Sequence, residues 1–381
     1  MSLGAPPGWA VMVAWVAMAA FQFGFGISEL NALHSRFVGA QRTLTCLGLT
    51  EDQYGYVTAM YTCGGGLASM TLIPLPRYVH MGRKAYLNVS AALTLAGGLL
   101  LSLSTTLPYL LGARLLQGLG AGIAVVQVPL YLQELAPQPL AGTIGICNQL
   151  ATVTGIFVAQ AIGTATVLGG LAWRHVPLAS VVLATVQLVY GIEYAVESPG
   201  WLAMHGAGMG IPAPHAADIV RAHLGLVYDS LPQHSHRAAE RAPRSLAQGL
   251  RIVVVTQAAQ QLSGVNAIIY YSTGILSTLL PSMAPFVGLL ITIINAGMTL
   301  PPLWLVDDPR VGRKRLLLLS AGGMGVCSLV LAFALAHVNA WLSGTAIVLM
   351  IACFSIGLGP VPFVLIPEVM PPDKASDSTG S

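Results

Sequence analysis

Charged side chains are scarce in this chain of 381 residues, which has 17 Lys and Arg and 14 Asp and Glu, together 8% of the sequence. A soluble globular protein carries about 25% charged residues, so the composition excludes that class. Hydrophobic residues make up 55% of the chain, and the mean hydropathy is +0.73. The sequence therefore predicts a polytopic membrane protein.

Signatures of enzymes and metal sites are also lacking. The five cysteines share no metal-ligand spacing and are expected to be small core residues. His234 and His236 have no Cys or acidic cluster nearby, which favours a solvated loop over a metal site. Gly118, Gly120 and Gly122 lie within an apolar segment, where glycines allow close helix packing rather than nucleotide binding. We therefore expect no enzyme activity, no cofactor and no metal.

Long apolar segments are what the chain has instead. A helix needs roughly 20 predominantly apolar residues to cross the hydrocarbon core of a bilayer. Ten windows of the sequence meet this requirement, which predicts an all-α protein. The windows are 9–30, 52–75, 85–107, 108–133, 142–167, 173–194, 247–277, 284–306, 315–337 and 341–370.

Lys and Arg residues fall mostly on one side of the predicted spans. With the N-terminus in the cytoplasm, 13 of them lie in cytoplasmic segments, whereas the opposite loops hold only Arg36 and Arg42. Positive residues collect on the cytoplasmic side, so this orientation is predicted. The net charge of +3 follows from topology, and no nucleic-acid partner is expected. Residues 1–8 carry no Lys or Arg and precede a full-length span, so a cleaved signal peptide is not expected.

Two short motifs recur at nearly equal offsets along the chain. Gly82-Arg83-Lys84 matches Gly312-Arg313-Lys314, and Val128-Pro129 with Glu134 matches Val361-Pro362 with Glu368. Such spacing predicts two parallel halves around a binding site near the middle of the membrane.

The repeat also predicts a domain division. Residues 1–196 form an N-terminal six-helix bundle, 197–246 a cytoplasmic linker with short helices near 214–228, 247–370 a C-terminal bundle of four helices, and 371–381 a polar tail. The second half then lacks the counterparts of two helices of the first, so ten of an expected 12 spans are present. A truncated gene model, a fragment and a naturally shortened variant all fit this length.

The segment from Gln260 to Tyr271 places three amides and two phenols in an otherwise apolar span, and we call it the amide stripe. Amides donate and accept hydrogen bonds without charge, as the hydroxyls of a polyol do. The stripe is therefore expected to bind a polyol. The alternative is that these amides join helices to one another, where each bond contributes about 0.6 kcal/mol.

Several motifs together resemble the sugar-porter family of the major facilitator superfamily, and the fungal members most of all. They are Phe21-Gln22-Phe23-Gly24-Phe25-Gly26, Gly112-Ala113-Arg114, Val128-Pro129-Leu130-Tyr131-Leu132-Gln133-Glu134, Gln149-Leu150, Trp173-Arg174, Glu197-Ser198-Pro199, the amide stripe, Asn295 and Gly359-Pro360-Val361-Pro362-Phe363. The resemblance implies the major facilitator fold with a hexose bound between the halves. Gln261-Leu262-Ser263 is associated with glucose-preferring members of this family.

The resemblance also implies a set of functional residues. The amides that would bind the sugar hydroxyls are Gln149, Gln260, Gln261, Asn266 and Asn295. Phe23 and Phe363 would form apolar walls, the latter where the family usually has tryptophan. The gate would comprise Tyr270, Tyr271, Pro360 and Pro362, although tyrosines near a membrane interface are also ordinary aromatic-belt residues.

Ion pairs at the cytoplasmic ends of the helices are the last implied feature, and we call them the latch. Its residues would be Arg83, Lys84, Glu134 and Glu197 in the first half and Arg313, Lys314 and Glu368 in the second. Arg114, an intramembrane charge at a helix start on the opposite side, is a further salt-bridge candidate. Basic side chains that only fix topology are the alternative. Ala141 and Gly200 stand where the family has arginine, and Ser355 replaces an acid seen in some relatives, so a weakened latch is expected.

Facilitated diffusion is the predicted mode of transport. Gly26 occupies the first-helix position where proton-coupled sugar porters carry Asp. Glu29, one turn further, is expected to be an interfacial acid, and proton uptake there is the alternative. A sugar sensor that does not transport is a further alternative. The expected partners are a monosaccharide and the lipid bilayer, with the chain monomeric in a plasma or vacuolar-type membrane.

Overall fold

The computed structural model describes residues 7–38, 47–72, 81–136, 141–169, 172–205, 246–269, 284–306, 308, 310–337 and 339–369. Throughout these ranges the chain is helical, apart from turns and one isolated β-bridge between Val38 and Leu49. The predicted all-α class is confirmed. Tyr270, Tyr271, most of the predicted linker and the polar tail lie outside the described residues.

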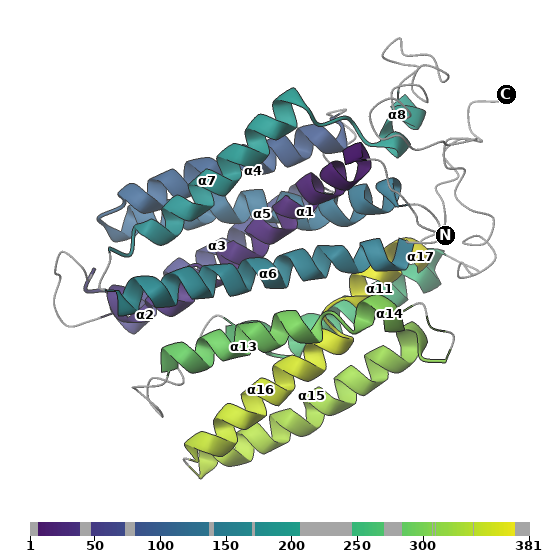
Figure 1. Ribbon diagram of the computed structural model, residues 1–381. Coiled ribbons are helices and arrows are strands. Elements are labelled where there is room, and N and C mark those ends of the chain that lie inside the picture. The colour runs from purple at the N-terminus through teal and green to yellow at the C-terminus, as the bar shows by residue number, and fades with distance from the viewer. Residues whose placement is uncertain are drawn as a thin grey trace.

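The N-terminal helices form one side of the molecule (Figure 1). They are α1 (Pro7–Ser28), η1 (Asn31–Leu33), α2 (His34–Phe37), α3 (Glu51–Thr71), α4 (Arg83–Leu103), α5 (Leu107–Leu135), α6 (Ala141–Leu168) and α7 (His175–Glu193), followed by the short α8 (Pro199–His205). Helix α5 packs against α3 and α4, and α1 packs against α6.

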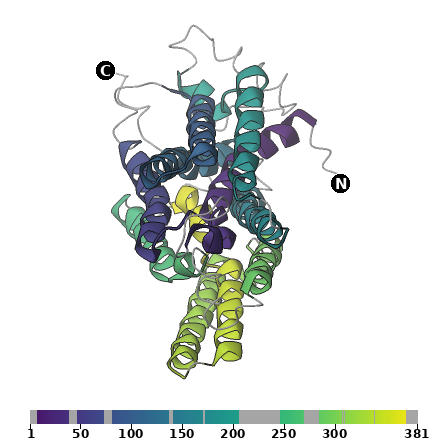
Figure 2. The ribbon, with the colours of Figure 1, turned by 90° about the vertical axis from the view of Figure 1, so that its left-hand side faces the viewer.

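The C-terminal helices lie on the other side, as both ribbon views show (Figure 2). They are α11 (Leu246–Leu262), α13 (Ala284–Met298), α14 (Pro302–Leu305), α15 (Gly312–Ala336), α16 (Ala340–Ile356) and α17 (Val361–Val369). Helices α13, α14 and α17 contact α6, which joins the two groups.

Nine helical stretches among the described residues are long and apolar enough to cross a membrane. Helix α3, in the second predicted window (52–75), is not one of them, because Glu51, Asp52 and several Gly and Thr residues lower its apolarity. It is still a 21-residue helix. Thr50 and Gln53 form a capping box that starts it, and it packs along α5.

Two predicted spans are interrupted rather than continuous. In the window 247–277, α11 ends at Leu262 and Gly264 takes a φ of 78°, a left-handed conformation that glycine adopts readily. In the window 341–370, a turn over Gly357–Pro360 separates α16 from α17. Broken helices are tolerated in membranes where protein groups satisfy the freed backbone, and transporters often bind substrate at such breaks.

Glycines set how closely the N-terminal helices approach one another. A Cβ added at Gly24 would lie 1.9 Å from the Thr152 carbonyl oxygen, so α1 and α6 touch backbone to backbone. A Cβ at Gly118 would lie 2.2 Å from the Tyr61 carbonyl oxygen, which places α5 against α3 in the same way. These contacts agree with the packing role predicted for the glycines of α5.

Apolar side chains from both groups of helices meet in one cluster, which we call the shared core. Ile27, Tyr61 and Ile156 come from the N-terminal helices. They pack with C-terminal residues that include Ile291 and Phe354. This cluster lies beside the residues of the candidate site.

Candidate functional site

Gln260, at the end of α11, is the most deeply buried amide of the stripe, with 4% of its surface exposed. Its Nε2 donates to the carbonyl oxygens of Leu358 at 2.7 Å and Gly359 at 3.0 Å. Both acceptors belong to the break between α16 and α17. Gln260 thus satisfies backbone groups that the break leaves without helical partners.

The other amides of the described stripe form a chain of hydrogen bonds that leads from Asn266 to Gln260. Asn266 Nδ2 donates to Gln261 Oε1 at 2.7 Å, and Gln261 Nε2 donates to Gln260 Oε1 at 3.3 Å. The Ser263 hydroxyl donates to the Gln260 carbonyl oxygen at 2.6 Å. The predicted sugar-binding amides Gln260, Gln261 and Asn266 are therefore bonded to one another and to backbone in this state.

Asn295, on α13, has a partner across the C-terminal group. The Ser355 hydroxyl of α16 lies 2.7 Å from Asn295 Oδ1 and 2.8 Å from the Ile351 carbonyl oxygen. Asn295 and Ser355 are both buried. Ser355, in the position where some relatives have an acid, thus fixes the orientation of the Asn295 amide.

Gln149 brings the N-terminal group to the same break. It is buried on α6, and its Nε2 lies 3.3 Å from the position of a Cβ added at Gly359. Gln149 and Gln260 therefore flank Gly359 from opposite groups of helices. The predicted gate residues Pro360 and Pro362 are buried beside this point.

The two predicted apolar walls differ in their surroundings. Phe23, on α1, packs against the shared core, and its carbonyl oxygen accepts from the Tyr61 hydroxyl at 2.9 Å. Phe363 is half-buried on α17. The sequence-predicted residues near Gly359 thus come together, whereas Phe23 lies with the polar residues of the N-terminal helices.

At the predicted cytoplasmic ends, the first-half latch is formed in part. Arg83 Nη2 lies 2.7 Å from Glu134 Oε1. Glu197 Oε1 accepts from the backbone N–H groups of Lys84 at 3.0 Å and Ser198 at 2.9 Å. A Cβ added at Gly82 would lie 1.9 Å from Glu197 Oε2, so a side chain at this position would displace the Glu197 carboxylate.

Burial raises the pKa of the Glu197 carboxyl, against the lowering effect of the backbone hydrogen bonds and of Arg83. In the second half, Arg313 Nη1 donates to the Val306 carbonyl oxygen at 2.9 Å, and Lys314 is exposed. The side chain of Glu368 lies outside the described residues.

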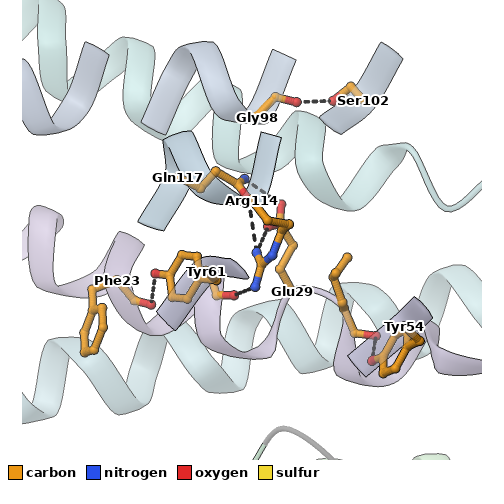
Figure 3. A network of polar contacts seen from close by, with 10 residues as sticks. Phe23, Glu29, Tyr54, Tyr61, Gly98, Ser102, Arg114 and Gln117 are labelled. Atoms are coloured by element: carbon orange, nitrogen blue, oxygen red, sulfur yellow. Dashed lines mark hydrogen bonds and ion pairs between the residues drawn. The ribbon is translucent and has the colours of Figure 1, made fainter. Parts of the chain in front are cut away.

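Arg114 forms a salt bridge inside the N-terminal helices, separate from the contacts of Arg83 and Lys84. Its side chain and that of Glu29 are both fully buried, with Nη1 and Oε2 3.0 Å apart (Figure 3). Arg114 Nη2 donates to the Gly26 carbonyl oxygen at 2.9 Å, and the guanidinium lies 4.4 Å from the centre of the Tyr61 ring. The expectation that Glu29 is an interfacial acid is wrong, because its side chain is buried inside the bundle, where it pairs with the positive charge of Arg114 on α5.

Gln117 completes this buried network, and sequence reasoning missed it. Its Oε1 accepts from Arg114 Nη1 at 3.1 Å, and its Nε2 lies 3.4 Å from Glu29 Oε1. Gln22 and Gln187 form a second amide pair between α1 and α7 that was also missed. Amides inside apolar spans were the available signal, the same one that identified the stripe on α11.

Comparisons with known proteins agree with the helical arrangement. A family model described as "Sugar (and other) transporter" matches residues 9–377. A probable metabolite transport protein of Saccharomyces cerevisiae is 28% identical, over 94% of this chain and 80% of that protein. The human solute carrier family 2 facilitated glucose transporter member 4 is 29% identical, over 92% and 74%.

Among solved structures, the xylose transporter XylE from E. coli in a partially occluded inward-open conformation superposes with a TM-score of 0.72 at 22% identity, covering 94% of this chain and 87% of that one. This likeness confirms the predicted major facilitator fold. The family match over nearly the whole chain identifies the protein as a member of the sugar (and other) transporter family and a multi-pass membrane protein.

Proposed function

We propose that this chain carries a monosaccharide, a glucose-like hexose, across the membrane by alternating access and without coupling to an ion gradient. The observation that carries the proposal is the meeting of Gln149 and Gln260, from opposite groups of helices, at Gly359. Relatives named as glucose and xylose transporters support the substrate class.

In this proposal the sugar replaces protein partners at the amides. Its hydroxyls would exchange with the bonds that join Asn266, Gln261 and Gln260. One neutral hydrogen bond is substituted for another of the same kind, so no buried amide is left unsatisfied, which would cost about 1–3 kcal/mol. Gln149 and Asn295 would bind further hydroxyls, and Phe23 and Phe363 would cover the faces of the ring.

The gate follows from the same bonds. Gln260 pins the Leu358 and Gly359 carbonyl oxygens, and Ser320 Oγ accepts from the Leu358 N–H at 2.9 Å. A sugar hydroxyl that accepts the hydrogen bond of Gln260 Nε2 would release the carbonyl oxygens of the turn before Pro360 and Pro362. Helix α17 could then move. Tyr270 and Tyr271 would close the opposite entrance.

The two groups of helices are proposed to be the moving units, with the N-terminus in the cytoplasm. The latch would hold the cytoplasmic ends of the helices together. Its residues are Arg83, Lys84, Glu134 and Glu197 in the first half and Arg313, Lys314 and Glu368 in the second. A monomer is sufficient for this mechanism.

Uptake of labelled glucose into proteoliposomes tests the site. Gln261→Ala should reduce uptake severalfold, because the amide that links Gln260 to Asn266 is lost. Thr256→Ala is the matched control on α11, since its hydroxyl already bonds to the Ile252 carbonyl oxygen at 2.8 Å. Equal uptake by wild type and Gln261→Ala would remove the amide stripe from the sugar site.

Proton-coupled transport is the second candidate, and the burial of Glu29 against Arg114 favours testing it. A carboxylate inside the membrane is a candidate proton site. Uptake driven by an inward proton gradient, and lost in Glu29→Gln while counterflow persists, would establish coupling. Uptake that is indifferent to the gradient in both proteins supports facilitated diffusion.

A further inference from the structure

A small polar cavity lies inside the N-terminal helices, beside the network drawn in Figure 3. Tyr61 and Phe23 contribute to its walls, and its polar lining otherwise consists of six side chains. These are Gln22, Gln117, Gln187, Ser90, Thr94 and Ser180. They come from α1, α4, α5 and α7, so four helices besides α3 line the cavity.

Two amide atoms that border this cavity lack partners. Gln22 Nε2 donates to Gln187 Oε1, which leaves Gln22 Oε1 and Gln187 Nε2 buried and without a hydrogen bond to any described group. Turning over both amides would not change this count, because one amide–amide bond always leaves one acceptor and one donor. Gln22 is 6% exposed and Gln187 1%, so bulk water does not satisfy them.

The size of the cavity and its lack of charge favour water over an ion or a small molecule. Its free volume is about 10 Å³, which is close to the smallest cavity that takes one water molecule and far below the ~300 Å³ of a small-molecule site. All of its lining residues are uncharged, which argues against an ion. A water molecule can donate to one group and accept from another, as this pair requires.

We propose that the N-terminal bundle contains a resident water-binding site between α1 and α7, in which one water donates to Gln22 Oε1 and accepts from Gln187 Nε2. The Ser90 and Thr94 hydroxyls donate to the Gly120 and Ser90 carbonyl oxygens, so their oxygen lone pairs can accept the second hydrogen of the water. An unsatisfied buried amide costs about 1–3 kcal/mol, and the water removes that cost.

The site also reaches the buried ion pair. Gln117 lines the cavity with part of its side chain and bonds to both Arg114 and Glu29. The water is therefore separated from the charges by one amide side chain. Gln117, which bonds to both Glu29 and Arg114, would thus lie next to a water molecule inside the bundle. This placement does not depend on whether the chain transports a sugar.

Two measurements on the full-length protein test the site. A cryo-EM structure that resolves ordered water should show density within hydrogen-bonding distance of Gln22 Oε1 and Gln187 Nε2. X-ray hydroxyl-radical labelling should modify Tyr61, which borders the cavity and is 3% exposed, faster than Trp173, which is 1% exposed and lies in another cluster.

The double variant Gln22→Leu/Gln187→Leu should lower Tyr61 labelling to the level of Trp173. Ser102→Ala should leave it unchanged, because that hydroxyl bonds to the Gly98 carbonyl oxygen at 2.8 Å and does not line the cavity (Figure 3). The proposal is overturned if wild-type Tyr61 labels no faster than Trp173, or if density shows the two amides turned to protein partners. The wild-type measurements decide the matter even where the double variant does not fold, and neither outcome bears on sugar uptake.

Discussion

Charged residues are few in this chain, so the loss of a single charge can leave a buried partner without a counter-charge. Glu29 and Arg114 are such a pair. Removing both charges of a buried pair is often tolerated, whereas removing one leaves the other unpaired and costs about 3–5 kcal/mol. The pair is therefore a sensitive point of the N-terminal bundle.

Arg114→Leu should lower the midpoint of thermal unfolding in detergent strongly, because Glu29 then remains buried without its partner. Glu29→Leu/Arg114→Leu should recover part of that loss. The comparison requires the same detergent and pH for all proteins. Losses that simply add in the double variant would mean that the two side chains do not interact.

Glu197 should make stability depend on pH. Burial raises its pKa above the ordinary value, so between those two values the folded protein binds more protons than the unfolded chain. The free energy of unfolding then falls as pH rises through this interval. Glu197→Gln should flatten that part of the curve when thermal midpoints are measured from about pH 4 to pH 8.

The exposed Glu193 provides the comparison for this measurement. Glu193→Gln should keep the slope of the wild type. An unchanged slope in Glu197→Gln would show that its carboxyl does not titrate differently in the two states.

At the scale of helices, close approach depends on positions without a side chain. Gly118→Ala places a Cβ 2.2 Å from the Tyr61 carbonyl oxygen, so α3 and α5 must separate. Overpacking of this kind costs about 1–3 kcal/mol. The thermal midpoint should fall accordingly.

Gly66→Ala is the matched control for that change, because it lies on α3 with no neighbouring atom within 4 Å of an added Cβ. It should leave the midpoint unchanged or raise it, since alanine favours helix by about 1 kcal/mol over glycine. If both variants lose the same stability, helix packing is not the reason for glycine at 118.

How far the sequence predicts this protein also depends on the helices. Each span is recognised from the apolar residues within its own window of about 20 residues. The positions of most spans and of the amide stripe therefore follow from the local sequence. The breaks after α11 and after α16 are harder to predict from the sequence. They lie at Gly264 and near Pro360 and Pro362, but glycine and proline also occur in continuous membrane helices. The pairing of Glu29 with Arg114 was out of reach, since no local pattern links α1 to α5.

For the whole molecule, orientation is the main prediction. Arg83 pairs with Glu134 at the end of α5, where Trp9 of the first turn of α1 donates to the Leu135 carbonyl oxygen. Helix α8 lies at the same end of the molecule (Figure 1). That end should face the cytoplasm. A glycosylation sequon inserted between Val38 and Leu47 should therefore be modified in a eukaryotic host.

The gel shift produced by glycan removal measures that modification. A second sequon placed in 206–245 should stay unmodified, and so should the native Asn88-Val89-Ser90 at the start of α4. The reverse pattern of modification would invert the assigned orientation.

The buried ion pair has a further consequence for synthesis of the chain. Glu29 precedes Arg114 by 85 residues, so its carboxylate leaves the ribosome well before its partner exists. Glu29 directly follows the last residue of α1, at the end of the first predicted span, and a charge that enters the hydrocarbon core without a partner is costly. The end of the first span is therefore expected to stay near the lipid headgroups until α5, in the fourth predicted span, brings Arg114 to neutralise Glu29.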